Sequence, residues 1–111
     1  MIEAVNANSG AQLRLASLVR RAFDADVRLE RAIRAWAAQN EEAAQALHRV
    51  DDERTAYLAD LLKTESIPPK PALDRARFIY WAYLGRAMTK PETDSGTSDV
   101  DIESIVELFL P

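Results

Sequence analysis

His48 is the only histidine in this chain of 111 residues, and the chain contains no cysteine. Asp51 and Asp52 follow it at the i+3 and i+4 positions, a helical spacing that could bring a ring nitrogen and carboxylate oxygens to one metal ion. Di-metal carboxylate bundles, however, need a Glu-x-x-His motif on two helices. Gln45 stands three residues before His48. The favoured interpretation is therefore an exposed or partly buried histidine, and no metal site is predicted.

The other side chains of the sequence do not form a recognisable catalytic arrangement either. The serines cannot all use His48 as a base, and none lies in a nucleophile-elbow motif. Three scattered glycines do not make a phosphate-binding loop. Neighbouring acids such as Glu41 and Glu42 point apart on a helix and do not converge on one substrate. The sequence predicts neither catalytic residues nor a cofactor, and the expected protein is not an enzyme.

Arg54 is a charged residue beside a predicted apolar stripe, at i+4 from Val50 and i−3 from Tyr57. A charge in that position is costly unless it is paired. The favoured alternative is that Arg54 reaches solvent or pairs with an acid such as Asp74; the other is that it contacts an acidic group of a bound ligand. The aromatic residues belong to a core or an interface unless the helices leave a cavity between them.

Five helices must position these side chains. Apolar residues recur at helical spacing through most of the chain, no alternating strand pattern occurs, and 19 alanines against three glycines favour helix. The sequence therefore predicts an all-α fold. The expected helices are 11–23, 27–39, 41–63, 72–88 and 99–110.

Apolar stripes indicate which face of each helix is buried. On the first three helices these stripes consist of Leu15, Leu18, Val19, Ala22 and Phe23, then Leu29, Ile33 and Trp36, then Leu47, Val50, Tyr57 and Leu61 with Leu58 and Leu62 beside them. Glu30 and Arg34 are expected to pair on the outside of the second helix.

Several residues are predicted to begin or end these helices. Asn40 has the chemistry of an N-cap, and the two acids after it favour the positive end of a helix dipole. Three prolines within 64–71 predict a loop, because proline cannot continue a helix. Residues 91–98 are predicted to be a flexible loop. Ser98 with Asp101 resembles a capping box that opens the final helix.

Residues 77–85 read RFIYWAYLG and are apolar almost all the way round. A surface helix of a small protein shows one apolar stripe and one polar face. This segment is therefore predicted to be covered on two sides, by its own core and by a second surface.

Composition narrows the class of protein further. The chain is 48% hydrophobic and 29% charged, which is typical of one globular domain. The net charge is −4, and residues 92–111 carry six acids and no base. Because nucleic acid is bound largely through Lys and Arg, DNA or RNA binding by this chain alone is not expected. No apolar run reaches the roughly 20 residues of a membrane span, and the start lacks a signal-peptide pattern, so a cytoplasmic protein is expected.

Three phrases occur in a characteristic order: RAWA at 34–37, R-x-x-Y-L-x-x-L-L at 54–62, and A-R-x-x-Y-x-x-x-x-G at 76–85. Together they resemble the C-terminal regulatory domain of TetR-family transcriptional repressors, over about residues 11–90. The resemblance implies that residues 11–111 bind an effector and dimerise, in an orthogonal or bundle-like arrangement, and that residues 1–10 are the remnant of a connecting helix or linker.

The family's N-terminal helix-turn-helix module, which binds the operator, is not found in this chain. The expectation is therefore that the polypeptide reaches DNA only through a missing N-terminal domain. A trimmed fragment, a gene with a misplaced start and a natural protein that lost its DNA-reading module are all consistent with this departure from the family's pattern.

The resemblance also implies a homodimer in which the last two helices and their symmetry mates form a four-helix bundle. The candidate pocket residues for a small hydrophobic effector are Trp36, Arg54, Tyr57 and Phe78. The candidate interface residues are Tyr80, Trp81, Tyr83, Leu84, Ile102, Ile105, Val106 and Phe109. The alternative function is a protein–protein interaction module that heterodimerises with a full-length TetR-type regulator.

Overall fold

A computed structural model describes residues 2–63, 66–89 and 100–110 of the chain. Within these ranges the secondary structure is helical and contains no strand, which confirms the predicted all-α class. The helices are α1 (Ile2–Asp24), α2 (Arg28–Ala37), α3 (Glu41–Leu62), α4 (Pro69–Thr89) and α5 (Ile102–Glu107). None of them is both long enough and apolar enough to cross a bilayer.

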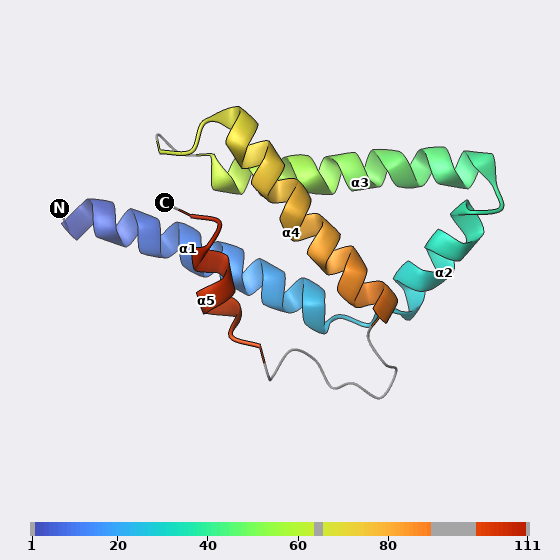
Figure 1. Ribbon diagram of the computed structural model, residues 1–111, viewed down its shortest axis with the longest axis horizontal. Helices are drawn as coiled ribbons and strands as arrows, with labels where there is room; N and C mark the ends of the chain where they lie inside the picture. Colours follow the sequence, from blue (N-terminus) through green and yellow to red (C-terminus); the bar gives the residue numbers. More distant parts are fainter. Residues whose placement is uncertain (1, 64–65, 90–99, 111) are drawn as a thin grey trace.

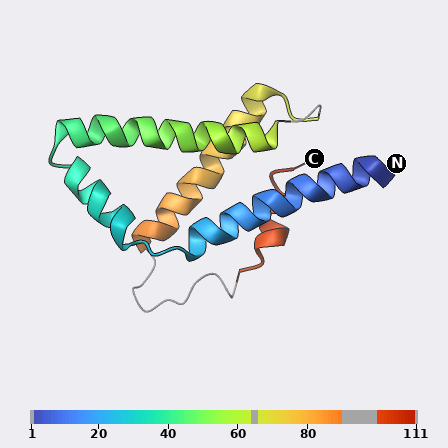
Figure 2. The ribbon, with the colours of Figure 1, turned by 180° about the vertical axis from the view of Figure 1, so that it is seen from behind.

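The helices form a thin, elongated arrangement. Figure 1 shows α4 running diagonally between α1 and α3, with α2 joining the far ends and α5 crossing α1, and Figure 2 shows the same order from behind. The Cα atoms extend over 53 × 31 × 15 Å, and their radius of gyration is 15.5 Å. A compact chain of this length would have about 13 Å. Much of the helix surface therefore has no covering layer within the described ranges of the chain.

The core lies where α1, α3, α4 and α5 meet. Two alanines of α4, Ala72 and Ala76, are fully buried, and their small side chains allow the neighbouring helices to approach closely. α1 contributes Leu15 and Val19 from its predicted stripe. The other buried members of the core are Ala16, Leu58, Ala59, Leu62, Ile67, Ile79, Tyr80, Ile102 and Val106.

Two of the three residues in the predicted stripe of α2 are exposed, and the third, Ile33, is half-buried. Leu29 and Trp36 are 70% and 60% exposed, whereas Glu30 is only 7% exposed. The expected pair of Glu30 and Arg34 forms, with 3.4 Å between Oε1 and Nη2, but it faces inward. Asp51 and Arg54 of α3 and the Tyr80 hydroxyl of α4 meet this face of α2, so its polar side is the one that faces the other helices.

The stripe of α3 is displaced from its predicted place. Leu58, Ala59 and Leu62 are buried, while Tyr57 and Val50 are exposed. α4 crosses α3 near the C-terminal end of α3 (Figure 1), so the side of α3 that carries Leu58 and Leu62 packs against α4. Periodicity alone did not indicate where that crossing occurs.

The N-terminal boundaries of two helices differ from prediction. α1 begins at Ile2 and not near residue 11, so Gly10 lies inside a helix. α4 begins at Pro69 and not at residue 72, with Pro69 and Pro71 in its first turn. Proline is tolerated there because the first backbone N–H groups of a helix have no intrahelical partner. The amide of Ala72 then donates to the carbonyl of Pro68 at 3.0 Å.

The two predicted caps have different outcomes. The Asn40 cap of α3 is confirmed, since its side chain accepts a hydrogen bond from the Ala43 amide at 2.9 Å. The final helix is capped by Asp101, which accepts from the Ser104 amide at 3.1 Å. α5 is shorter than the expected helix 99–110. The backbone amides of residues 108–110 donate to the carbonyls three residues earlier, as in a 3₁₀ turn, so they do not continue the α-helix. Ser98 and the predicted loop 91–98 lie outside the described residues.

Candidate functional site

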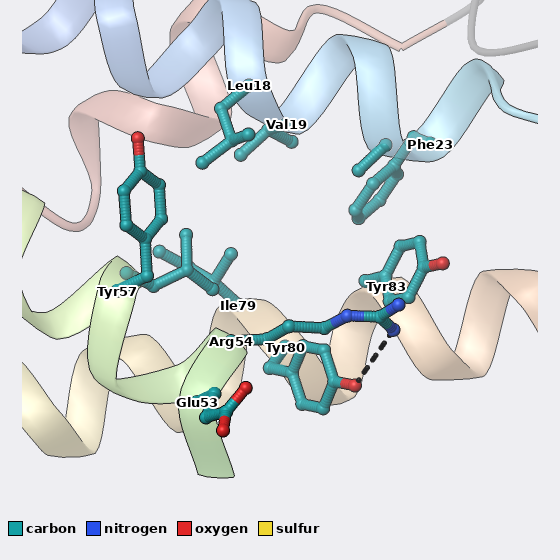
Figure 3. A pocket seen from close by; sticks show the side chains of 11 residues that line it. Leu18, Val19, Phe23, Glu53, Arg54, Tyr57, Ile79, Tyr80 and Tyr83 are labelled. Carbon is teal, nitrogen blue, oxygen red and sulfur yellow. Dashed lines mark hydrogen bonds between the residues drawn. The ribbon is translucent and has the colours of Figure 1, made fainter. Parts of the chain in front are cut away.

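A cavity of about 390 Å³ lies between α1, α3 and α4 (Figure 3). Its size is within the range of small-molecule sites in proteins, which are mostly apolar with a few polar groups. All three helices contribute side chains to it, and these are predominantly apolar or aromatic. The lining residues are Leu18, Val19, Ala22, Phe23, Glu53, Arg54, Tyr57, Leu58, Ile79, Tyr80 and Tyr83.

Aromatic rings from three helices surround the cavity. Tyr57 stands at one end, across from Leu18 of α1, and Phe23 and Tyr83 meet at the other end (Figure 3). The rings of Phe23 and Tyr83 are 6.2 Å apart between centroids. Tyr83 also stacks on Tyr80, with 5.8 Å between centroids. These packed rings favour an aliphatic or aromatic ligand over a strongly hydrated one.

Two residues of the lining, Arg54 and Tyr80, belong to a polar cluster that also contains Glu30, Arg34 and Asp51. Arg34 donates to both carboxylate oxygens of Asp51, at 2.6 Å from Nη2 and 3.2 Å from Nη1. Arg54 donates from Nη1 to Glu30 and to the Tyr80 hydroxyl, each at 3.4 Å. Two cations thus meet two carboxylates, and the cluster carries no net charge.

The Tyr80 hydroxyl connects the apolar cavity to this cluster. It donates a short hydrogen bond to Oδ1 of Asp51 and accepts one from Arg34 at 3.4 Å. The helical spacing of the partners explains the convergence. Glu30 and Arg34 are four residues apart on α2, and Asp51 and Arg54 are three apart on α3, so each pair shares one face of its helix.

The environment of the cluster shifts the pKa values of its groups. Burial would raise the pKa of Asp51, but hydrogen bonds from Arg34 and Tyr80 stabilise its carboxylate and hold the pKa below its usual value. Burial, together with the hydrogen bond to Asp51, raises the pKa of Tyr80 to about 12. Burial also raises the pKa of Tyr83, and the negative charge of Glu30 raises it further. Both tyrosines are neutral at physiological pH.

Two of the four predicted pocket residues, Arg54 and Tyr57, line the cavity. Trp36 and Phe78 do not, because both lie more than half exposed on outer helix faces. Arg54 is paired with Glu30 and not with Asp74.

Asp74 lies instead in a separate group on α4. Its Oδ1 is 2.6 Å from Lys70 and 3.7 Å from Arg77.

The predicted interface residues are distributed over several environments. Tyr80, Ile102 and Val106 are buried within the chain itself. Tyr83, Leu84 and Phe109 are partly buried against the core. Trp81 and Ile105 remain exposed.

The sequence did not predict that α1 lines the cavity. It also did not predict that Glu30 and Arg34 of α2 belong to the polar cluster. The spacing of Glu30 and Arg34 indicated a pair but not the direction in which it faces. Asp51 drew notice only as a neighbour of His48, which is exposed on α3. Among the described residues, no group of three or more His, Cys, Asp and Glu side chains is arranged to hold a metal ion.

Comparisons of this chain with models of protein families, with curated proteins and with solved structures found no match. The functional argument therefore depends on the cavity and on the residues around it.

Proposed function

We propose that this chain is the ligand-binding domain of a cytoplasmic regulator, and that it takes a small hydrophobic molecule into the cavity between α1, α3 and α4. The observation that carries the proposal is the cavity itself, about 390 Å³ with apolar and aromatic walls. The cavity is open to solvent on one side, so its apolar walls contact water when it holds no ligand. A ligand that covers these walls would remove apolar surface from water, which is favourable.

The position of the cavity suggests how binding is transmitted. It lies between helices and not within one loop, so a ligand contacts α1 on one side and α3 with α4 on the other. A ligand that fits one spacing of these helices better than another shifts the population toward that spacing. α1 is the first element of the described chain, and in the TetR-like arrangement proposed here it would carry the movement to a DNA-reading module.

The proposal includes a homodimer formed through the outer face of α4. Phe78 and Trp81 are 62% and 57% exposed, and their rings contact each other with centroids 5.4 Å apart. With Gly85 and Met88 they follow the 3-4-3 spacing of a helix-packing seam. A side chain at Gly85 would meet nothing within 4 Å, so this position leaves space in which a partner's ring can pack.

Ligand binding is tested by filling the cavity from within. Ala22→Leu adds bulk to a lining residue, and Ala35→Leu adds the same bulk to an exposed position on α2 that does not line the cavity. We expect Ala22→Leu to weaken binding of the fluorescent probe 1-anilinonaphthalene-8-sulfonate at least tenfold, while Ala35→Leu binds it as the unmodified chain does. Equal binding by all three proteins would contradict the proposed site.

The dimer is tested by sedimentation equilibrium at micromolar concentration. We expect a dimer that Trp81→Glu dissociates and that Trp36→Glu, an equally exposed tryptophan change on α2, leaves intact. A monomeric unmodified chain would remove the homodimer from the proposal. It would favour the second candidate, in which the same exposed face of α4 pairs with a full-length TetR-type regulator.

A further inference from the structure

A second cavity, of about 410 Å³, adjoins the first on the other side of Leu18 and Tyr57. Both of these side chains line both cavities, so the two spaces are neighbours along the groove between α1 and α3. The second cavity is more polar than the first. Its lining consists of Leu13, Arg14, Ser17, Leu18, Arg21, Tyr57 and Leu61.

Two arginines give the second cavity a positive charge. Arg14 and Arg21 are seven residues apart, which is two helical turns, and Ser17 lies between them on the same face of α1. Neither arginine has an ion pair or a side-chain hydrogen bond with the described part of the chain. No Asp or Glu is among the residues that line this cavity. The charge of both guanidinium groups is therefore available to an anion.

We propose that the two cavities form one elongated site for an aliphatic carboxylate of fatty-acid type. The alkyl chain lies in the apolar cavity, passes between Leu18 and Tyr57, and places its carboxylate at Arg14 and Arg21. This inference rests on the proposed ligand-binding function and names the class of ligand. Arginine suits this role because its planar fork can donate two hydrogen bonds to a carboxylate.

The length of the groove agrees with a medium-length chain. The α1 residues that line the two cavities extend from Leu13 to Phe23, and ten residues of helix span about 15 Å. With carbon–carbon bonds of about 1.5 Å, an extended alkyl chain advances roughly 1.3 Å per carbon. Dodecanoate therefore matches the distance, whereas butanoate would reach the arginines without filling the apolar cavity.

Arg54 is the other cation at the lining, and it does not suit the carboxylate as well. Its Nη1 already lies 3.4 Å from Glu30 and 3.4 Å from the Tyr80 hydroxyl. A carboxylate placed there would meet the negative charges of Glu30 and Asp51 in a partly buried site. The carboxylate consequently belongs in the second cavity, beside Arg14 and Arg21, and the alkyl chain points from there into the apolar cavity.

Isothermal titration with dodecanoate below its micelle concentration tests the proposal. Dodecanol supplies the same chain without charge. Two variants of the full chain are compared: the double variant Arg14→Gln/Arg21→Gln, and Arg49→Gln, which removes an exposed arginine on α3 that lines neither cavity. We expect the double variant to bind dodecanoate at least tenfold more weakly and dodecanol unchanged, while Arg49→Gln binds both as the unmodified chain does. Far-ultraviolet circular dichroism verifies that each variant is folded.

Each other outcome has a distinct meaning. If dodecanoate and dodecanol bind the unmodified chain equally well, and the double variant binds both normally, the carboxylate site is overturned while the apolar cavity stands. If Arg54→Gln weakens dodecanoate binding and the double variant does not, the assigned direction is overturned. If neither compound binds and the fluorescent probe does not bind either, both the inference and the proposed function fail.

Discussion

Two groups of arginines border the two cavities, and they differ in whether the chain supplies their counter-charges. Arg54 lines the apolar cavity, Arg34 belongs to the same polar cluster, and their counter-charges are Glu30 and Asp51. Arg14 and Arg21 lie along the groove without such partners in the described part of the chain. A paired cation in a partly buried site holds helices together, whereas an unpaired one at a cavity wall is available for a ligand.

The largest expected effect comes from removing the carboxylate of Asp51. Asp51→Ala leaves Arg34, whose side chain is 22% exposed, without its bidentate partner. Breaking a buried ion pair costs about 3–5 kcal/mol, and the partial exposure of this pair reduces the expected loss to roughly 2–3 kcal/mol. Urea denaturation measures it. Asp52→Ala, a change at the next and exposed residue, should stay within about 0.5 kcal/mol. Equal losses would show that the cluster does not hold α2 to α3.

A smaller loss is expected from Tyr80→Phe, which keeps the ring and removes the hydroxyl. The hydroxyl donates to Asp51 and accepts from both arginines, so its removal should cost roughly 1–2 kcal/mol in the free energy of unfolding. Tyr57→Phe is the matched control because that tyrosine is exposed. In a spectrophotometric titration, the tyrosine step near pH 12 should disappear from Tyr80→Phe only. Its persistence would contradict the assignment.

Acid should weaken the fold through the same cluster. The pKa of Asp51 is lower in the folded chain than its usual value, so the unfolded chain binds a proton first as pH falls. The stabilisation from this group is fully present above about pH 4 and is lost as pH drops through the folded pKa. Urea midpoints measured from pH 6 to pH 2 should fall less for Asp51→Asn than for the unmodified chain. Parallel curves would contradict this.

The smallest effect on stability is expected at the unpaired arginines. Arg14→Gln/Arg21→Gln removes no described partner and should change the free energy of unfolding by no more than about 0.5 kcal/mol. Measuring this double variant and Asp51→Ala in one series of urea curves compares the unpaired arginines directly with the paired ones. A loss as large as that of Asp51→Ala would show that these arginines support the fold, and it would weaken their assignment to a ligand.

The helices were largely predictable because their signals are local. Asn40 caps α3 through a hydrogen bond that spans only three residues, and the apolar spacing of α1 is visible in any window of the sequence. Which face of each helix is buried was less predictable. Leu29 and Trp36 have the spacing of a buried stripe, yet α2 turns Glu30 inward because Arg34 and Arg54 compensate its charge there.

The site was predicted only in part, for the same reason. Arg54 and Tyr57 were identified because a charge and an aromatic ring stood together on one helix. Phe78 and Trp36 were expected in the pocket because of their type alone, and both lie on outer faces. Arg14 and Arg21 carried no signal, because their role depends on a groove between two helices that are far apart in sequence.

The sequence by itself determined an all-α chain and the approximate extent of its helices, since hydrogen bonds and apolar spacing within a helix depend on near neighbours. It also determined that residues 77–85 are apolar on more than one side. Only the tertiary structure decided that Ile79 and Tyr80 are buried while Phe78 and Trp81 face outward. The positions at which helices cross determine which of two apolar faces is buried, and those positions depend on contacts among all the helices at once.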